Sequence, residues 1–446
     1  MTINEAKNID LEEIITKSNE YQKKYNLFVT IISDIKKNNL NGPLANVVYT
    51  TKDNFSTKDI LTTASSNTLK NYIPIYDATV ISKLNSLGAI NIGKTAMDEL
   101  GMGGTGLTAH TGPVINPFDE TRIPGGSSSG SAVSVATNLV PFSLGSDTGD
   151  SIRKPAAYLG VVGYKPTYGL ISRYGLIPLA SSLDHVGVFT TNVYDVALVV
   201  DNIKGLDEND MTTFDSSKMD LLSNLKDKVN PKLFYIEELG DVPYFQEVIK
   251  KLESTGIKVE PVSIDINILN ALKPTYDCIS SAETTSNNSN LTGILFGGMG
   301  EGESTEEMMI DYRTKNLNSE VKRRFVIGSF VLQKENQEKY FLNACRVRRL
   351  IVENISDLFN TYDGLIMPAS GGVVPKIKEL DSEVNEALEN NLLIGNFGGF
   401  PSITIPAANI DNLPVGINLT CQIKEDAKLL NIAYNLEEII NYKGVK

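Results

Sequence analysis

Three short stretches decide how this chain folds. They are Val47-Val-Tyr-Thr-Thr-Lys52-Asp-Asn54, Pro124-Gly-Gly-Ser127-Ser-Ser-Gly-Ser131-Ala132 and Gly145-Ser-Asp-Thr-Gly-Asp-Ser151-Ile-Arg-Lys-Pro155. The first is typical of a buried strand that ends at a lysine. The other two combine serines with glycines, which let the backbone approach another group closely. Residues 88–169 hold 15 of the 35 glycines, so we expect the chemistry of this protein to lie there.

Around these stretches, strand-like and helix-like segments alternate, which predicts an α/β fold. We expect one unit over residues 1–446, with amphipathic helices in about residues 1–40 and a core in about residues 45–190. No repeat or linker justifies a division of the chain. The expected strands are 47–50, 89–92, 186–190, 232–236, 365–368 and 402–406. The expected helices are 77–87, 193–203, 244–254 and 320–350, and residues 283–305 are expected to form a long loop.

Composition excludes several classes of protein. With 41 Lys and Arg against 54 Asp and Glu, the net charge is −13, which suits a poor general binder of nucleic acid. The two histidines and three cysteines form no zinc-site pattern, so we expect no metal. No apolar run reaches the ~18–20 residues that span a bilayer. The acidic N-terminus resembles no signal peptide, which favours a cytoplasmic protein, although a removed organellar presequence would leave the same sequence.

Three familiar motifs match the sequence but lack their usual context. Gly101-Met-Gly103-Gly-Thr-Gly106 fits the dinucleotide fingerprint, yet no strand precedes it directly. Gly126-Ser-Ser-Ser-Gly130 fits the nucleophile elbow of α/β-hydrolases, again without a preceding strand. Ser151-Ile-Arg-Lys154 fits the SxxK pattern, in which the lysine activates the serine, so Lys154 stays a rival candidate for the base.

A serine nucleophile in a chain with two histidines needs another base. Neutral lysine can serve if burial lowers its pKa from about 10.4 to near 7–8, a change of roughly 4 kcal/mol. Lys52 ends an apolar strand, 75 residues before Ser127, and Ser151 follows 24 residues after that.

In both motif and spacing, these segments resemble the amidase signature family. The resemblance implies a large central mixed β-sheet flanked by helices and a Ser–Ser–Lys triad. By residue-by-residue correspondence, Ser151 would be the nucleophile, Ser127 the bridging serine and Lys52 the base. The resemblance also implies a cis Gly126–Ser127 peptide bond. The oxyanion hole would consist of backbone N–H groups in the turn before the nucleophile, contributed by Thr148, Gly149 and Asp150.

Further segments resemble the glutamine-hydrolysing A subunits of tRNA-dependent amidotransferases. They are residues 164–184, Met97-Asp-Glu99, Asn116-Pro117 and Glu320-Val-Lys-Arg-Arg324. This resemblance implies that glutamine is hydrolysed and that ammonia passes to the partner B and C subunits. The partners would hold the misacylated tRNA and use ATP and Mg²⁺, with no cofactor in this chain. Whether the tRNA is tRNA(Gln), tRNA(Asn) or both stays open.

For the substrate, the resemblance implies that Arg324 binds the α-carboxylate of glutamine and that Glu389 stands where the family has an aspartate for the α-ammonium. A family tyrosine aligns with Asp277. Lys154 replaces the usual Gln, and Ser129 replaces a usual Gly. Two other interpretations stay open. One is a free-standing amidase for another small amide, against which residues 164–184 argue. The other is a catalytically silent scaffold subunit, which the departures at Glu389 and Asp150 leave open.

Asp150 replaces a usual Gly directly before the nucleophile. A carboxylate about 6 Å from a developing oxyanion, at an effective dielectric of about 20, would cost roughly 3 kcal/mol. We therefore expect the side chain of Asp150 to turn outward and pair with Lys154 or Arg153.

Overall fold

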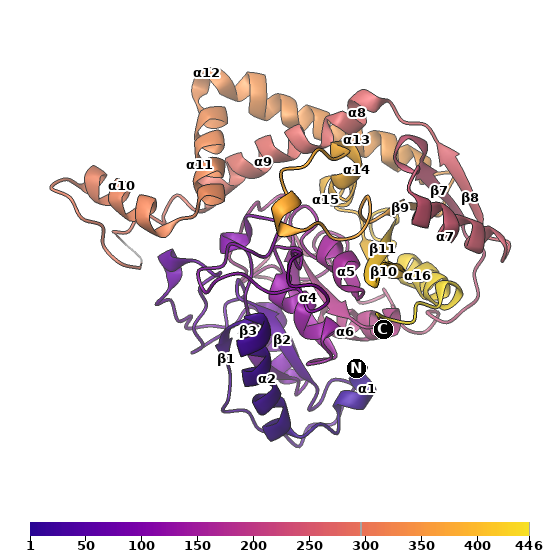
Figure 1. Cartoon of the computed structure of the whole chain (residues 1–446), viewed down its shortest axis with the longest axis horizontal. Coiled ribbons are helices and arrows are strands. Elements are labelled where there is room, and N and C mark those ends of the chain that lie inside the picture. Colours follow the sequence, from indigo (N-terminus) through magenta and orange to yellow (C-terminus); the bar gives the residue numbers. More distant parts are fainter. Residues whose placement is uncertain (295–296, 446) are drawn as a thin grey trace.

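The computed structural model describes residues 1–294 and 297–445. Its centre is a mixed sheet of eleven strands in the order β1-β3-β2-β4-β6-β5-β10-β11-β9-β7-β8. Helices flank this sheet, as Figure 1 shows, so the expected large mixed sheet is confirmed. The strands are β1 (Phe28–Ile31), β2 (Val48–Lys52), β3 (Ile90–Thr95), β4 (Phe142–Asp147), β5 (Val162–Lys165), β6 (His185–Thr190), β7 (Lys232–Ile236), β8 (Lys258–Val262), β9 (Gly364–Pro368), β10 (Ser402–Ile410) and β11 (Leu413–Thr420).

Two groups of parallel strands lie toward opposite ends of the sheet, and antiparallel strands join them; β1 adds an antiparallel strand at one edge. β2 runs parallel to both β3 and β4, and β7 runs parallel to both β8 and β9. From β4 to β9, each strand pairs antiparallel with its neighbour. The parallel pairing of β2 and β4 positions the candidate site, because it brings the end of residues 47–54 beside the start of residues 145–155.

Helices bury both faces of the sheet. α4 (Ser129–Ala136) contacts β4 and β2, and α5 (Arg153–Leu159) contacts β5, β10 and β11. α6 (Val193–Ile203), α16 (Asp426–Ile440) and α7 (Pro243–Glu253) contact one another in series. Successive strand residues point to opposite faces, and accordingly Val48 packs with the α4–α5 side while Tyr49 packs with the α6–α16 side.

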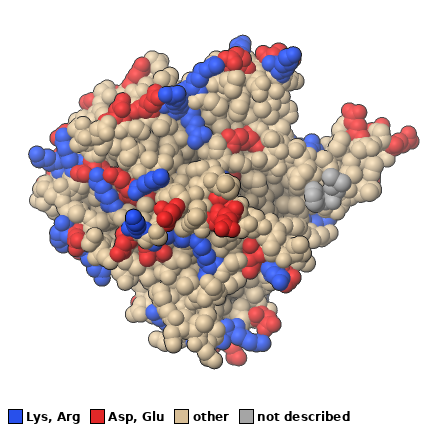
Figure 2. Space-filling model, turned by 180° about the vertical axis from the view of Figure 1, so that it is seen from behind, with Lys and Arg blue, Asp and Glu red and all other residues tan. Residues whose placement is uncertain are grey.

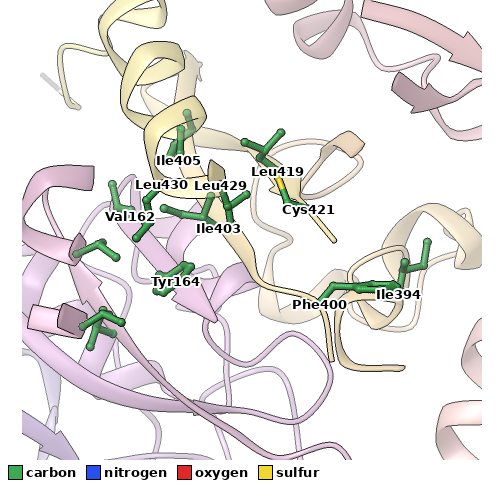
Figure 3. Close-up of a cluster of buried hydrophobic side chains, with 14 of the residues drawn as sticks. Val162, Tyr164, Ile394, Phe400, Ile403, Ile405, Leu419, Cys421, Leu429 and Leu430 are labelled. Atoms are coloured by element: carbon green, nitrogen blue, oxygen red, sulfur yellow. The ribbon is translucent and has the colours of Figure 1, made fainter. Parts of the chain in front are cut away.

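A cluster of buried apolar side chains joins the two parts of the sheet. Figure 3 shows Val162 and Tyr164 of β5 near Ile403 and Ile405 of β10, with Leu429 and Leu430 of α16 among them. All six are at most 1% exposed. Residues far apart in the sequence thus form one core. This core holds β10, and the chain directly before it, close to residues 145–155.

The N-terminal prediction was wrong in part. α1 (Ile3–Ala6) and α2 (Leu11–Tyr25) are helical, but α2 ends at Asn26 in the left-handed conformation, and the chain then forms β1. β1 pairs antiparallel with β3 at the edge of the sheet. Phe28 and Ile31 are spaced as on a helix face, and a four-residue segment is too short for periodicity to separate helix from strand.

The region between β8 and β9 is a helical arm. It comprises α8 (Ile266–Asn270), α9 (Leu272–Asn287), α10 (Thr305–Asn316), α11 (Ser319–Leu332), α12 (Lys334–Gln337), a π-helical turn (Glu338–Leu342) and α13 (Asn343–Leu358). Residues 283–287 therefore belong to α9 rather than to the expected loop, of which residues 295–296 lie outside the described residues. The expected single helix over 320–350 breaks at Gln333, whose ψ of 142° is not helical.

Shorter helices complete the fold. They are α3 (Thr79–Ser86), α14 (Glu386–Glu389), α15 (Leu393–Phe397) and the 3₁₀ turns Asn67–Leu69, Glu99–Gly101, Glu237–Leu239 and Ile377–Glu379. Figure 2 shows acidic and basic side chains interspersed on the face that it presents, without one large basic area. Within the described residues, every helix is too short or too polar to cross a bilayer.

Candidate active site

The site forms where β2 and β4 end side by side. Because these strands are parallel neighbours, their carboxyl ends meet at the same edge of the sheet. Lys52 is the last residue of β2, and Ser127 lies just before α4. The Nζ atom of Lys52 is 2.8 Å from the Oγ atom of Ser127, and both side chains are buried. The structure therefore brings together two residues that are 75 positions apart.

Ser146 of β4 makes the other two contacts of the lysine. Lys52 Nζ donates to the carbonyl oxygen of Ser146 at 3.2 Å and to its Oγ at 2.9 Å. Asn54 Nδ2 also donates to Ser146 Oγ, at 2.9 Å, and fixes that hydroxyl. A neutral amine has two N–H donors and one lone pair. The two donors can bind the two oxygens of Ser146, and the lone pair can accept the hydroxyl proton of Ser127.

Burial sets the protonation of Lys52. Loss of water lowers its pKa to about 7, although Asp147, Asp98, Asp184 and Asp150 act in the opposite direction. No carboxylate of the described residues contacts the amine directly, so the charged form has no close counter-ion to compensate desolvation. A substantial fraction of Lys52 is thus neutral near neutral pH, as a general base requires.

The loop that carries Ser127 turns around a buried carboxylate. The Gly126–Ser127 peptide bond is cis, as the resemblance implied. Gly126 lies so close to Asp98 that a Cβ atom there would be 2.1 Å from Asp98 Oδ2. Asp98 accepts hydrogen bonds from the backbone N–H groups of Thr105 and Gly106. The glycine-rich loop 101–106, which matches the dinucleotide fingerprint, therefore wraps an aspartate of this chain.

Ser151 lies beside the cis bond. The N–H of Ser128 donates to the carbonyl oxygen of Ser151 at 3.3 Å, which brings the second and third decisive stretches together. Ser151 is 6% exposed and lies just before α5. The turn from Thr148 to Asp150, whose N–H groups were assigned to the oxyanion hole, connects β4 to this serine.

A buried arginine fixes that turn. Arg153 Nη2 donates to Asp147 Oδ1 at 3.1 Å and to the carbonyl oxygen of Gly149 at 2.7 Å. The same guanidinium donates to Asn396 Oδ1 at 2.6 Å and to the carbonyl oxygen of Leu392 at 2.7 Å. Burial alone would raise the pKa of Asp147, but the adjacent Arg153 holds it well below its usual range. The turn is therefore held between β4 and α15.

Tyr276 and Arg324 lie on the outer side of the turn. A Cβ atom at Gly149 would be 3.1 Å from the Tyr276 ring, so this ring packs directly on the glycine. The Arg324 guanidinium lies 5.7 Å from the centre of the same ring. The tyrosine that packs on this turn is thus Tyr276, the residue before Asp277, which was expected to align with a family tyrosine. Asp277 pairs with Lys273 on α9 instead.

Lys154 pairs with Glu389 and not with Asp150. Lys154 Nζ lies 2.7 Å from Glu389 Oε2, and Glu389 Oε1 accepts the N–H of Gly371 at 2.9 Å. Burial alone would lower the pKa of Lys154, but Glu389, Tyr158 and Asp150 together raise it above its usual value, so Lys154 stays protonated. Arg153 pairs with Asp147. The expected ion pair between Asp150 and Lys154 or Arg153 was therefore wrong: α14 brings in an acid that sequence proximity could not reveal.

Comparison with known proteins agrees with this geometry. The family model described as Amidase matches residues 11–430. The chain belongs to the amidase family. Among similar amidase-family proteins, the A subunit of glutamyl-tRNA(Gln) amidotransferase from Sulfolobus acidocaldarius is 38% identical, with 97% of this chain and 94% of that protein covered. The protein of the same name from Mycoplasma pneumoniae is 40% identical, over 90% and 88% of the two chains.

A solved structure of a similar protein has the same fold as this chain. The A subunit of glutamyl-tRNA(Gln) amidotransferase from Thermotoga maritima superposes with a TM-score of 0.82 at 34% identity, covering 98% of this chain and 94% of that one. The coverage shows that this amidase-family chain shares the fold of these subunits over nearly its whole length.

Sequence reasoning did not identify several residues of this amidase site. Ser146 and Asn54 stood inside the decisive stretches but carried no motif of their own. Arg153 was considered only as a partner for Asp150, although its guanidinium joins the turn to α15. Asn396 lies far beyond Ser151 in the sequence and gives no local signal. The available signal for a buried ion pair was the position of Arg153, which begins a mostly apolar helix shortly after a glycine-containing turn.

Proposed function

We propose that this chain is the glutamine-hydrolysing subunit of a tRNA-dependent amidotransferase. The observation that carries the proposal is the contact between Lys52, at the end of β2, and Ser127, just before α4, with the pKa of Lys52 lowered to about 7. The similarity to subunits named for glutamyl-tRNA(Gln) amidotransferase, over nearly the whole chain, supports this choice among amidase reactions.

In the proposed reaction, Ser151 Oγ attacks the side-chain amide carbon of glutamine. The serine proton passes through the Ser127 hydroxyl to the lone pair of neutral Lys52. When the C–N bond breaks, the protonated lysine returns the proton by the same route, and ammonia leaves. Water then hydrolyses the ester on Ser151, which releases glutamate and restores the serine.

The negative charge on the amide oxygen needs donors during both steps. The N–H groups of Thr148, Gly149 and Asp150 are our candidates, since Arg153 and Asn396 fix the turn that carries them. Donors that are already oriented cost no reorganisation when the charge develops. Arg324 supplies a positive charge for the α-carboxylate of the substrate.

Ammonia would serve a partner of this chain. We propose that the partner B and C subunits hold the misacylated tRNA and that the partner uses ATP and Mg²⁺ to activate it. No cofactor is assigned to this chain. The net charge of −13 suits a subunit that leaves the nucleic acid to another protein. We place the reaction in the cytoplasm, with Glu-tRNA(Gln), Asp-tRNA(Asn) or both as acceptors.

The test is ammonia release from L-glutamine by the chain with its co-purified partners, with and without misacylated tRNA and ATP. The proposal predicts glutamine hydrolysis that Ser151→Ala abolishes, and amide transfer to tRNA that requires ATP. Hydrolysis of simple amides without any turnover of glutamine would instead indicate a free-standing amidase. No amide hydrolysis at all, with the partners bound, would indicate a scaffold.

A further inference from the structure

One carboxylate of the site has no partner. Asp150 immediately precedes Ser151, and its side chain is only partly buried. Within residues 1–294 and 297–445, it forms neither an ion pair nor a side-chain hydrogen bond, because the nearby cations are bound elsewhere. Asp150 is also not among the described residues with a left-handed backbone, so the aspartate is accommodated without strain.

Glu389, the acid expected to bind the substrate ammonium, already accepts hydrogen bonds from two other groups. Both carboxylate oxygens of Glu389 accept strong donors, one from Lys154 and one from the N–H of Gly371. Lys154 also donates to the backbone carbonyl oxygen of Glu389 at 2.8 Å. The pair carries no net charge, and recruiting Glu389 for a second cation would mean breaking a 2.7 Å ion pair of a buried lysine.

Asp150 is well placed relative to the positive end of the site. The Tyr276 ring packs on Gly149, the residue before Asp150, and the Arg324 guanidinium lies 5.7 Å from the centre of that ring. Arg324 donates through Nε to Glu320 and through Nη1 to Ser280, while its Nη2 has no partner among the described residues. A free guanidinium donor thus lies beside the ring, and the unpaired carboxylate belongs to the residue between Gly149, on which the ring packs, and the nucleophile.

This arrangement matches a zwitterionic α-amino acid. We propose that Asp150 is the residue that binds the α-ammonium of the substrate, while Lys154 and Glu389 form a closed pair that does not contact that ammonium. The inference rests on the proposed glutamine hydrolysis. It assigns substrate selectivity to the position where this chain departs from the usual glycine. It also removes the electrostatic objection to Asp150, since the bound ammonium would neutralise the carboxylate beside the oxyanion.

The ionisation of Asp150 should make the affinity for glutamine depend on pH. Burial raises the pKa of Asp150 to about 6; the negative charges of Asp147 and Glu389 add to this, and the positive charges of Lys154 and Arg153 oppose it. Only the ionised carboxylate attracts an ammonium group. Affinity for the amino acid is therefore expected to fall as the pH drops through about 6.

The experiment measures equilibrium binding by the full chain with its partners, in a Ser151→Ala background that cannot turn over. The two ligands are L-glutamine and glutaric acid monoamide, which carries the same amide and carboxylate without the ammonium. Asp150→Asn is expected to weaken glutamine binding at least tenfold and monoamide binding less than twofold, and to remove the loss of glutamine affinity below about pH 6. Glu389→Gln should change the preference between the two ligands less than threefold.

Two results would overturn the inference. In one, Asp150→Asn leaves the preference for glutamine over the monoamide unchanged while Glu389→Gln abolishes it. In the other, Asp150→Asn weakens both ligands equally, which would give Asp150 a structural role. Failure of the proposed function itself is distinguishable, because the wild-type complex would then release no ammonia from glutamine. Thermal unfolding of each variant separates lost binding from lost folding.

Discussion

At the scale of single residues, the two lysines of the site differ because of their partners. Lys52 is enclosed by serines, so burial lowers its pKa to about 7. Lys154 is equally buried but contacts a carboxylate, and its pKa is raised. Only the first can exchange a proton near neutral pH. The same side chain thus becomes a base or a fixed charge according to whether an acid lies in direct contact with it.

Replacing each lysine tests that distinction. Lys52→Ala should lower the kcat for glutamine about a thousandfold or more, since it removes the general base. Lys154→Gln should lower it less than tenfold, because the variant leaves every proton-transfer group in place. Steady-state ammonia release measures both. A large loss with Lys154→Gln and a small one with Lys52→Ala would reverse the assignment.

The pH dependence follows from the same group. Since the base must be neutral, the kcat for glutamine should rise with pH and level off above about 7, the pKa of Lys52. Substituting Asp184, which accepts from Thr148 Oγ1 at 2.6 Å and raises the pKa of Lys52, with Asn should move this midpoint to lower pH. A kcat that is constant from about pH 5 to 8 would exclude a titrating lysine base.

Arg324 provides a test of substrate binding. Arg324→Ala should raise the KM for glutamine by tenfold or more, because a charge-assisted contact to the α-carboxylate is lost. Transfer driven by added ammonium should change less than twofold. Arg323→Ala is the matched control, because Arg323 is the preceding residue on α11, also pairs with Glu320 and is more exposed. An equal loss of both activities in Arg324→Ala would make this arginine structural.

At the scale of elements, β4, α5 and α15 depend on one ion pair. Asp147 and Arg153 are fully buried, and Arg153 also binds backbone carbonyls of two segments. Removing one partner of a buried pair costs roughly 3–5 kcal/mol. We expect Arg153→Met to lower the free energy of unfolding by this amount in urea denaturation.

The control for Arg153 is an arginine pair at the surface. Arg349 bonds Glu353 one turn away on α13, with the two side chains 80% and 51% exposed. Arg349→Met should leave the free energy of unfolding almost unchanged, because exposed ion pairs contribute little to stability. Equal costs for the two variants would mean that the Asp147–Arg153 pair does not hold the turn.

Elements with local signals were predictable from the sequence, and elements with distant partners were not. The strand 232–236 and the helix 193–203 were predicted with their observed bounds, because each has a continuous apolar pattern. β1 was misassigned since its stability comes from pairing with β3, which lies far along the chain. In the site, Lys52, Ser127 and Ser151 stood in recognisable motifs. The pairing of Glu389 with Lys154 joins residues 235 apart and leaves no local trace.

At the scale of the whole molecule, the sheet explains why the site needs nearly the full chain. Lys52 and Ser151 come from its first part, while Asn396 and Glu389 come from beyond β9. The cluster of Figure 3 joins the two through β5, β10 and α16. A fragment that ends before β10 would keep Lys52, Ser127 and Ser151 but lose the strand that pairs with β5.

Because the site needs residues beyond β9, removing the C-terminal part of the chain should abolish activity. A fragment of residues 1–380 should show neither cooperative unfolding nor glutamine hydrolysis, because β5 would lose its neighbour and Arg153 its acceptors at Leu392 and Asn396. Calorimetry and ammonia release measure the two properties. A cooperatively folded, active fragment would show that the sheet has independent halves.

In the proposed reaction, Ser151 attacks glutamine while Ser127 only relays the proton to Lys52. The most direct measurement is a rapid acid quench of the complex during glutamine turnover, followed by mass spectrometry of its peptides. We expect a γ-glutamyl ester on Ser151 in wild type and none in Lys52→Ala. An ester on Ser127, or full turnover with no ester on either serine, would contradict this claim.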